Sequence, residues 1–388
     1  MKPKILISSF SFPPENNGVS HAAFMHAGIM QSLGCEVDVV TRGDSFSREA
    51  QKCFSVTRFP ISGNGRLFKP HRGSLKELDA FLRHNCWDIV FTHCWQAWST
   101  NCLLDFFSRA DRSEKLVLVS HGISTDSNFH PFPRNWLRRL LWMPYRVFSV
   151  PKYMRLIDRL VVLWDHFDDD RFLDHKIARS MCVPVSVIPN VARYDATSIN
   201  RPCLKFTQEQ LAGGFMLSVG NYSEEKNEFF VLEAYIRSRM THVPLIFVGR
   251  QLNNYSAGLE RHARQSGLNN VQFCERLSKE EIDWLYKYAD LFLCGSKNEC
   301  QPMVILDCFA SRTVCVSRNV GCVRSFPGVV VVSNSDEMSA SLRPLLFDSV
   351  KRQELADQGF DLYKKEFCFS AAHEKWGALL KQLLSQNQ

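Results

Sequence analysis

The chain has 388 residues and a formal net charge of +7, with 45% hydrophobic and 22% charged residues. This composition is typical of a folded globular protein and excludes the disordered and fibrous classes. The length exceeds what one hydrophobic core usually serves, so two domains are expected. No run of about 18 apolar residues occurs, and the first residues enter a strand-like segment without the apolar region of a signal peptide. We therefore expect a cytoplasmic protein.

The first half of the chain alternates short strand-like runs with helical patterns. Residues 4–10 are apolar, residues 22–33 have helical periodicity and stop at Gly34, and residues 36–41 again form a strand-like run. A helical pattern also occupies residues 74–83. The further strands expected in this half are residues 54–61, 88–94, 115–121, 159–163 and 185–189. Such alternation predicts a parallel, doubly wound sheet.

A second alternation begins after a linker, which the lapse of apolar periodicity between residues 191 and 214 predicts. The expected strands are residues 215–220, 244–248, 271–274, 291–294, 314–317 and 329–332, and the helices between them are residues 227–240, 254–266, 279–289 and 303–310. The second half is therefore expected to form another doubly wound α/β domain. Ligands of such sheets bind at the carboxyl ends of the strands, so those loops are the place to look for a site.

The 14 cysteines are scattered along the chain, and no two of them form a CxxC pair. Most lie inside apolar runs, as in residues 291–294. Disulfide frameworks and structural metal sites show regular cysteine spacing, so buried free thiols are the better interpretation.

One loop of the second half carries a carboxylate directly before a helical pattern. Glu299 follows the expected strand 291–294, and Pro302 suits the first turn of the helix. The free N–H groups of a helix N-terminus favour an anion such as phosphate. Asp307 falls in the second turn, about 7 Å further along the axis, so one carboxylate is placed for a sugar and the other for a ribose. The alternative is that both are ordinary surface acids near a helix start.

A second loop follows the strand at the head of the same half. Gly220 allows close approach to the backbone, and Lys226 supplies a fixed positive charge suited to a diphosphate. The alternative is a solvated turn lysine paired with a neighbouring glutamate.

Together these loops resemble the retaining glycosyltransferases of family 4, whose second domain carries a V-G-R-x4-K loop and, much later, an E-x7-E motif. Lys226 matches the lysine, Glu299 the first acid and Asp307 the second, and Pro302-Met303 match the common E-G-F-P-M form of the loop.

The first half carries the same likeness. Asn17 and Gly18, which follow Pro13-Pro14, are similar to the family's first-domain glycine loop. Residues 119–122 resemble its T-x-H-G segment, and residues 187–190 resemble its V-I-P-N-G stop before the linker.

The resemblance implies an α/β protein of GT-B fold, with two Rossmann-like doubly wound domains facing a central cleft. It implies an acceptor-binding domain at residues 1–200 and a nucleotide-sugar-binding domain at 201–369, with a last helix, residues 370–388, that crosses back onto the first domain. The donor is a nucleoside diphosphate (NDP) sugar, and neither a metal nor a cofactor is expected.

The resemblance also implies roles for single residues. Lys226 and the amides near Met303 and Val304 neutralise the leaving diphosphate, which is the expected catalytic lever. Glu299 contacts the donor sugar, and His121 lies beside the reacting sugar. The catalytic set is Glu299, His121 and Lys226, and the donor-binding set is Asn17, Gly18, Gly220, Asn221, Lys226, Arg250, Gln301, Met303, Val304 and Asp307.

The chain departs from the family pattern at the diphosphate site. Asn221 stands where the family usually has an arginine, so Arg250 is a candidate to compensate. Asp307 is one methylene shorter than the usual Glu. These changes affect efficiency and donor identity more than fold.

A basic aromatic segment points to an anionic partner. Residues 134–159 contain seven basic residues and one acid. If the segment is helical, its apolar face suits a lipid interface and its arginines suit phosphate headgroups. The membrane-facing set is Arg134, Trp136, Arg138, Arg139 and Trp142. The alternative is that the apolar face packs on the first-domain sheet. No nucleic-acid motif accompanies the charge.

We therefore expect a retaining glycosyltransferase that uses an NDP-sugar and a glycan or lipid-linked acceptor, in the synthesis of cell-surface polysaccharide, lipopolysaccharide or glycolipid. It is expected to be cytoplasmic or peripheral on the inner face of the plasma membrane. Two alternatives remain, an NDP-sugar epimerase of the same fold and a catalytically silent sugar-nucleotide-binding or scaffold protein.

Overall fold

The computed structural model describes residues 2–50, 54–63, 70–110, 112–123, 134–165, 172–197, 200–240 and 242–385. The chain forms two compact units, the first made of Met1–Val191 with Phe369–Gln388 and the second of Ala192–Cys368. The division falls before residue 200 because the segment after Val191 is bonded to the second unit, as where the amide of Ala192 donates to the carbonyl of Phe367.

The first unit is built on an eight-stranded sheet. Its strands are β1 (Lys4–Ser8), β2 (Glu36–Arg42), β3 (Ser47–Ala50), β4 (Ser55–Phe59), β7 (Ile89–His93), β8 (Lys115–Ser120), β9 (Arg159–Val162) and β10 (Val185–Val187). The order is β10-β9-β8-β7-β1-β2-β4-β3, and every pair is parallel except β3 with β4. A separate two-stranded sheet pairs β5 (Ile61–Ser62) with β6 (Arg72–Gly73). The central strands are buried on both faces, as parallel sheets usually are.

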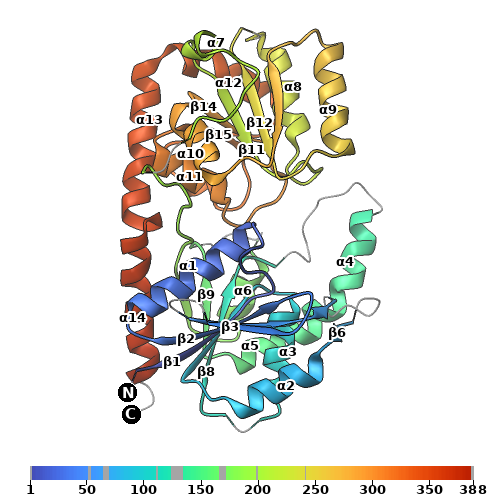
Figure 1. Ribbon diagram of the computed structural model, residues 1–388, viewed down its shortest axis with the longest axis vertical. Helices are drawn as coiled ribbons and strands as arrows, with labels where there is room; N and C mark the ends of the chain where they lie inside the picture. The colour runs from blue at the N-terminus through green and yellow to red at the C-terminus, as the bar shows by residue number, and fades with distance from the viewer. Residues whose placement is uncertain are drawn as a thin grey trace. The chain divides into compact units, whose positions relative to one another are not determined.

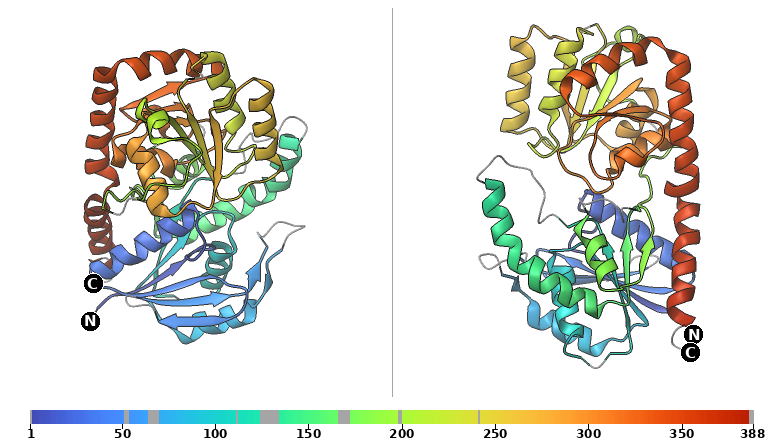
Figure 2. Two further views of the ribbon diagram at one scale, coloured as in Figure 1. Left: turned by 45° about the horizontal axis from the view of Figure 1, so that its top comes forward. Right: turned by 180° about the vertical axis from the view of Figure 1, so that it is seen from behind.

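Helices cover both faces of this sheet (Figures 1 and 2). One face packs against α1 (Gly18–Ser32) and α14 (Phe369–Ser385), which contact each other. The other face packs against α2 (Leu75–His84), α3 (Trp98–Phe107), α5 (Val150–Leu156) and α6 (Leu173–Ser180). Helix α4 (Arg134–Pro144) continues through a π-helical turn, Tyr145–Ser149, into α5.

The second unit has a six-stranded, fully parallel sheet of order β13-β12-β11-β14-β15-β16. Its strands are β11 (Met216–Val219), β12 (Leu245–Gly249), β13 (Val271–Glu275), β14 (Leu291–Cys294), β15 (Val314–Arg318) and β16 (Val329–Val332). Its longer helices are α8 (Glu228–Ser238), α9 (Asn254–Gln265), α10 (Lys279–Tyr288), α11 (Met303–Ser311), α12 (Ser335–Phe347) and α13 (Ser349–Leu362), and a short α7 (Gln208–Ala212) precedes β11. The chain order reverses at β11 and β14, which is where a doubly wound sheet usually binds its ligand.

Candidate functional site

The site in the second unit is built from the loops that follow β11 and β14. These strands are hydrogen-bonded neighbours, so their carboxyl ends and following loops lie side by side. The loops are also bonded to each other: the amide of Lys297 donates to the carbonyl of Glu225 at 2.8 Å, and Nδ2 of Asn227 donates to the carbonyl of Gly295 at 3.1 Å. These hydrogen bonds fix the positions of the two loops relative to each other, although the loops are about 70 residues apart in sequence.

Lys226 and Glu299 meet across these loops. Nζ of Lys226 lies 2.5 Å from Oε1 of Glu299, and the two side chains are 33% and 16% exposed. Burial lowers the pKa of Lys226, but the Glu299 carboxylate more than offsets this, so the pKa is raised and the lysine stays charged. The structure therefore brings together the lysine and the carboxylate that the sequence singles out.

Gly321 packs closely against the backbone of the Glu299 loop. Gly321 has a φ of +54°, and a Cβ at this position would lie 2.3 Å from the carbonyl oxygen of Cys300. The next residue, Cys322, donates its amide to that same carbonyl at 3.0 Å. Only glycine accommodates both the left-handed conformation and the close approach, so the shape of the loop is fixed by its neighbour rather than by its own side chains.

The N-terminus of α11 lies directly after this loop and has no side-chain cap. Pro302 occupies the N-cap position but makes no side-chain hydrogen bond to the helix, and the first turn contains no acid. The first amides of the helix, those of Met303 and Val304, therefore lack an intrahelical acceptor. Gln301 is buried directly before them. Together with Lys226, a helix N-terminus of this kind suits an anion.

Asp307, for which a ribose contact is expected, is bonded within the second unit. Its side chain is buried, and Oδ1 accepts hydrogen bonds from the amides of Arg193 and Tyr194 at 2.6 and 3.2 Å. Oδ2 accepts from Nε and Nη2 of Arg193 at 2.9 and 2.5 Å. Both oxygens are committed, so the carboxylate anchors the start of the second unit to α11, and a ribose contact does not follow from this geometry.

The remaining residues expected to bind the donor differ in exposure. Gly220 directly follows β11, and a Cβ there would lie 3.4 Å from Cγ of Lys226, so the lysine stem runs along the glycine. Asn221 is exposed. Arg250 is also exposed and follows β12, the strand next to β11, so it is at the same edge of the sheet as Lys226.

The sequence gives little reason to single out Glu228, the first residue of α8. It is 3% exposed, and among the described residues its Oε1 has no hydrogen-bond partner. Its Oε2 accepts a long bond from the amide of Ser223, at 3.4 Å. Burial raises the pKa of Glu228 to about 7. Acids at helix starts are common, and only the burial distinguishes this one.

In the first unit, His121 follows the end of β8 and belongs to a row of three histidines. Nε2 of His121 lies 3.2 Å from Nδ1 of His93, and Nε2 of His93 lies 3.0 Å from Nδ1 of His26. Burial lowers the pKa of all three, to about 4 for His121 and about 3 for His26. His93 and His26 are not evident from sequence, although His93 ends the strand next to β8.

Asn17 and Gly18 start helix α1 in the first unit. The side-chain oxygen of Asn17 accepts from the amide of Ser20 at 2.9 Å, and its Nδ2 donates to Oγ of Ser11 at 2.7 Å. The Asn17 side chain thus caps the helix. Gly18 is the first helical residue.

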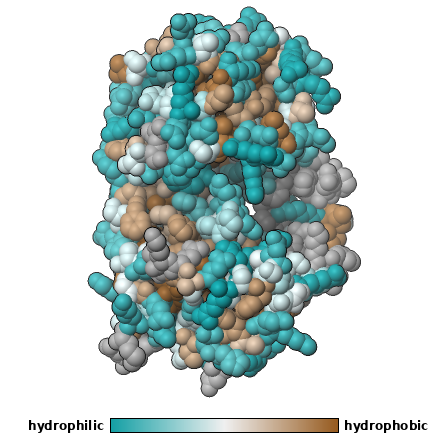
Figure 3. Space-filling view, viewed as in Figure 1, coloured by the Kyte–Doolittle hydropathy of each residue, from teal (hydrophilic) through white to brown (hydrophobic). Residues whose placement is uncertain are grey.

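Helix α4 presents most of its apolar side chains to the surface. The exposed ones in α4 and the following turn are Trp136, Leu137, Leu140, Leu141, Met143, Val147 and Phe148. Figure 3 shows apolar atoms at the right edge of the molecule, where α4 runs. Arg139 is exposed and Arg138 partly so.

The membrane-facing prediction is wrong for Trp142, which is buried in the core and packs edge-on against Tyr145 at 5.4 Å between ring centroids. Trp142 is six residues from the exposed Trp136, about 240° further around the helix, so the two tryptophans lie on different faces. Arg134 begins α4, but its side chain lies outside the described residues.

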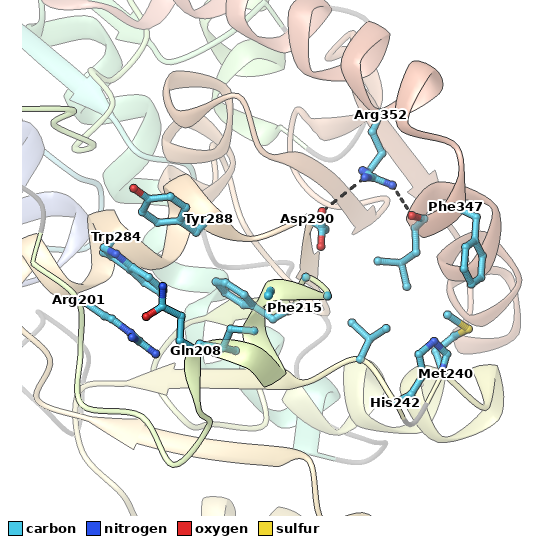
Figure 4. Close-up of a pocket in the computed structure, with 16 residues that line it drawn as sticks. Arg201, Gln208, Phe215, Met240, His242, Trp284, Tyr288, Asp290, Phe347 and Arg352 are labelled. Carbon is cyan, nitrogen blue, oxygen red and sulfur yellow. Dashed lines mark hydrogen bonds and ion pairs between the residues drawn. The ribbon is translucent and has the colours of Figure 1, made fainter.

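A cavity of about 900 Å³ opens at the opposite edge of the second sheet (Figure 4). Among its lining residues are Phe215, Val243 and Asp290, each at or just before the start of a strand. Figure 4 shows Trp284 and Tyr288 on one side and Arg352, which pairs with Asp290 at 3.5 Å, on the other. Neither Lys226 nor Glu299 lines it, so it is separate from the charged site.

In the described part of the chain, the structure shows the state of the cysteines and the placement of potential metal ligands. All the cysteines there are free, and seven are buried: Cys35, Cys94, Cys274, Cys294, Cys308, Cys315 and Cys322. Within the same residues, no group of three or more His, Cys, Asp or Glu is placed to hold a metal ion. None of the described helices is long and apolar enough to span a bilayer.

Comparison with known proteins gives two family matches. Residues 205–361 match the model of the glycosyl transferases group 1, and residues 17–165 match that of the glycosyl transferase 4-like domain. No curated protein matches the sequence.

Solved structures with a similar fold cover nearly the whole chain. A sucrose-phosphate synthase from Thermosynechococcus elongatus is 13% identical with a TM-score of 0.71, and an α,α-trehalose 6-phosphate synthase from Burkholderia multivorans is 14% identical with a TM-score of 0.73; each match covers 100% of both chains. Anabaena HepE, solved with UDP and glucose, is 15% identical with a TM-score of 0.70, covering 98% of this chain and 100% of the other. The likeness confirms the predicted fold class, an α/β protein of GT-B type.

Proposed function

Because the chain belongs to the glycosyl transferases group 1 family, we propose that it transfers a sugar from an NDP-sugar to a hydroxyl group of a glycan or lipid-linked acceptor, with retention at the anomeric carbon. The observation that supports this most directly is the Lys226–Glu299 pair beside the uncapped start of α11. A cation, free helix amides and a carboxylate at one sheet edge match the needs of a diphosphate bonded to a sugar.

The charge that develops on the leaving diphosphate is the part of the reaction that this site addresses. The bond from the anomeric carbon to the diphosphate breaks, a bond to the acceptor oxygen forms, and the acceptor proton leaves with the diphosphate. Lys226 and the first amides of α11 stabilise the negative charge as it grows. As the family resemblance implies, we assign this task to protein groups and to no metal ion.

Glu299 holds Lys226 in place until the donor arrives. A diphosphate carries more negative charge than one carboxylate, so it competes with Glu299 for Nζ of Lys226. The released carboxylate then accepts hydrogen bonds from sugar hydroxyls. Arg250, exposed at the same edge, is placed to add the positive charge that Asn221 does not supply.

The exposed face of α4 favours an acceptor at a membrane surface. Its apolar side chains suit the lipid interface, and Arg138 and Arg139 attract anionic headgroups. This arrangement fits a lipid-linked acceptor used in cell-surface polysaccharide, lipopolysaccharide or glycolipid synthesis, with the enzyme peripheral on the cytoplasmic face of the plasma membrane.

A donor panel followed by one substitution tests the proposal. The melting temperature is measured with UDP-, GDP-, ADP- and dTDP-sugars, and a selective rise identifies the donor. Release of the nucleoside diphosphate is then followed with and without lipid-linked acceptors, and NMR of the product gives its anomeric configuration. Glu299→Ala should abolish most of the transfer, and transfer or donor hydrolysis at the parental rate would refute the assigned site.

Two other results would favour the alternatives. An epimerised free sugar formed without acceptor would indicate an NDP-sugar epimerase of the same fold. Binding of a donor with no turnover by any acceptor would indicate a catalytically silent sugar-nucleotide-binding protein.

A further inference from the structure

Three histidines from three separate elements of the first unit form one hydrogen-bonded row. His26 lies in α1, His93 ends β7 and His121 follows β8. The two contacts, at 3.0 and 3.2 Å, each join an Nδ1 to an Nε2. His26 and His93 are 2% and 1% exposed, so water does not substitute for either contact.

The row can carry its protons in only two ways. Burial lowers the pKa of all three imidazoles, so each is neutral near pH 7 and has one N–H and one bare nitrogen. Both contacts are satisfied only if every ring has its proton on the same kind of nitrogen. In the first arrangement all three protons are on Nδ1, so His26 donates to His93 and His93 donates to His121. In the second all three are on Nε2, so His121 donates to His93 and His93 donates to His26.

The inner end of the row decides between these two arrangements. Nε2 of His26 is buried and has no hydrogen-bond partner among the described residues. His26 stacks on Trp376 of α14 at 3.9 Å between centroids and, with His93, borders a cavity of about 20 Å³ whose other walls are mostly apolar. A proton on this Nε2 would be a buried N–H without an acceptor, and such groups are rarer in proteins than unpaired acceptors. The bare nitrogen, and hence a proton on Nδ1 of each ring, is the better arrangement.

We propose that His26 and His93 are positioning residues that hold His121 with its proton on Nδ1, so that His121 donates a hydrogen bond to an oxygen atom of the transferred sugar. Within the described part of the chain, this Nδ1 makes no hydrogen bond to the protein. The proposal rests on the proposed function for the identity of the ligand, but the position of the proton is a property of the protein alone. The fixed proton makes Nδ1 of His121 a hydrogen-bond donor before the sugar binds. Without it, this nitrogen could act as donor or acceptor, depending on the tautomer.

The proton position can be read directly by NMR. The full chain is labelled with ¹⁵N-histidine, and long-range ¹H–¹⁵N spectra are recorded at pH 7, with His121→Gln identifying the His121 signals. We expect His121 protonated on Nδ1 and bare on Nε2. A His121 ring with its proton on Nε2 overturns the proposal, whatever the variants below show.

Two substitutions of His93 separate positioning from packing. His93→Leu removes the donor to His121, so the His121 signals should show a mixture of the two proton positions. In His93→Asn the amide nitrogen occupies the place of Nδ1 along the side chain and can still donate, so the wild-type signals should return. An unchanged His121 spectrum in folded His93→Leu protein contradicts the proposal.

Kinetics with the donor found in the panel complete the test. His93→Leu should lower kcat about tenfold to a hundredfold, and His93→Asn should recover most of it. Equal losses in both variants would mean that His93 acts through packing alone, which also overturns the proposal. If no NDP-sugar supports transfer while His121 carries its proton on Nδ1, the proposed function fails and the positioning of His121 stands.

Discussion

The loops at the carboxyl ends of the two sheets carry opposite kinds of polar chemistry. In the second unit, the loops after β11 and β14 hold a charged lysine against a carboxylate, both partly exposed. In the first unit, His93 ends β7 and His121 directly follows β8, and burial keeps both of these hydrogen-bonded histidines neutral. The same type of sheet edge can thus be equipped for charge or for directed hydrogen bonds.

The difference follows from what each edge is proposed to bind. A diphosphate brings several negative charges, which need a cation and helix amides that remain accessible. A sugar is neutral and polar, and neutral donors with fixed direction recognise it without the cost of burying a charge. Substitutions that remove charge from the second unit test this difference between the two sheet edges.

The largest expected effect comes from the ion pair between Arg193, which is partly exposed, and the buried Asp307. Arg193→Met leaves the buried Asp307 carboxylate without its cationic partner and with only the amides of residues 193 and 194 as donors, and we expect the free energy of unfolding to fall by about 3–5 kcal/mol. Chemical denaturation followed by circular dichroism measures this loss. Arg237→Met is the matched control, because it removes an exposed arginine paired with Asp336 and should change stability little. Equal losses in the two variants would show that the pair with the buried Asp307 has no special role.

Removal of the charged lysine should affect catalysis more than stability. Lys226→Met takes away the cation proposed to stabilise the leaving diphosphate, so transfer should slow by about 10²–10³-fold. Initial rates at saturating donor measure this effect. Lys297→Met removes an exposed lysine from the adjoining loop while keeping its backbone bond to Glu225, and it should stay near the parental rate. A comparable loss in both would point to net charge rather than to the Lys226 position.

Glu228 adds a pH dependence to the second unit. Its folded pKa, about 7, lies above the ordinary value of 4.5, so the folded protein keeps a proton that the unfolded chain releases between these pH values. Stability should therefore fall as pH rises from 4.5 to 7, by up to about 3 kcal/mol, and this contribution should be constant outside the window. Glu228→Gln cannot ionise and should flatten that fall. Denaturation curves of both proteins between pH 4 and 8 test it, and parallel pH profiles would exclude Glu228 as the cause.

The strands and the charged pair could be predicted from sequence because their signals are local. The run at residues 291–294 is observed as β14 with the same limits, and residues 329–332 as β16. Lys226 and Glu299 each follow such a strand, and the pairing of β11 with β14 brings them together.

The remaining features depend on partners far away in the chain. The contact between Asp307 and Arg193 could not be predicted, because no local pattern links two residues that are 114 positions apart. The histidine row joins residues from three elements, and no spacing rule connects them. Trp142 could not be separated from the exposed residues by periodicity alone, because the exposed face of α4 is itself rich in apolar side chains, among them Trp136, Leu137 and Leu140.

The smallest expected effect is on membrane binding by α4. This helix gives the first unit exposed positive charge at a place separate from its neutral histidines. Arg139 is exposed beside the apolar face of the helix. One basic residue near an anionic surface contributes about 1 kcal/mol, so Arg139→Ala should weaken binding to vesicles of phosphatidylglycerol and phosphatidylcholine about fivefold. Sedimentation with the vesicles measures the bound fraction.

The control and the lipid composition decide what such a loss means. Lys351→Ala removes an exposed lysine from α13 of the second unit and should leave vesicle binding unchanged. Binding should also weaken at high salt and be nearly lost on pure phosphatidylcholine, because the attraction between exposed charges is screened and needs anionic headgroups. Equal binding to neutral and anionic vesicles would instead assign the interaction to the apolar face alone, and no binding to either would leave that face for a protein partner.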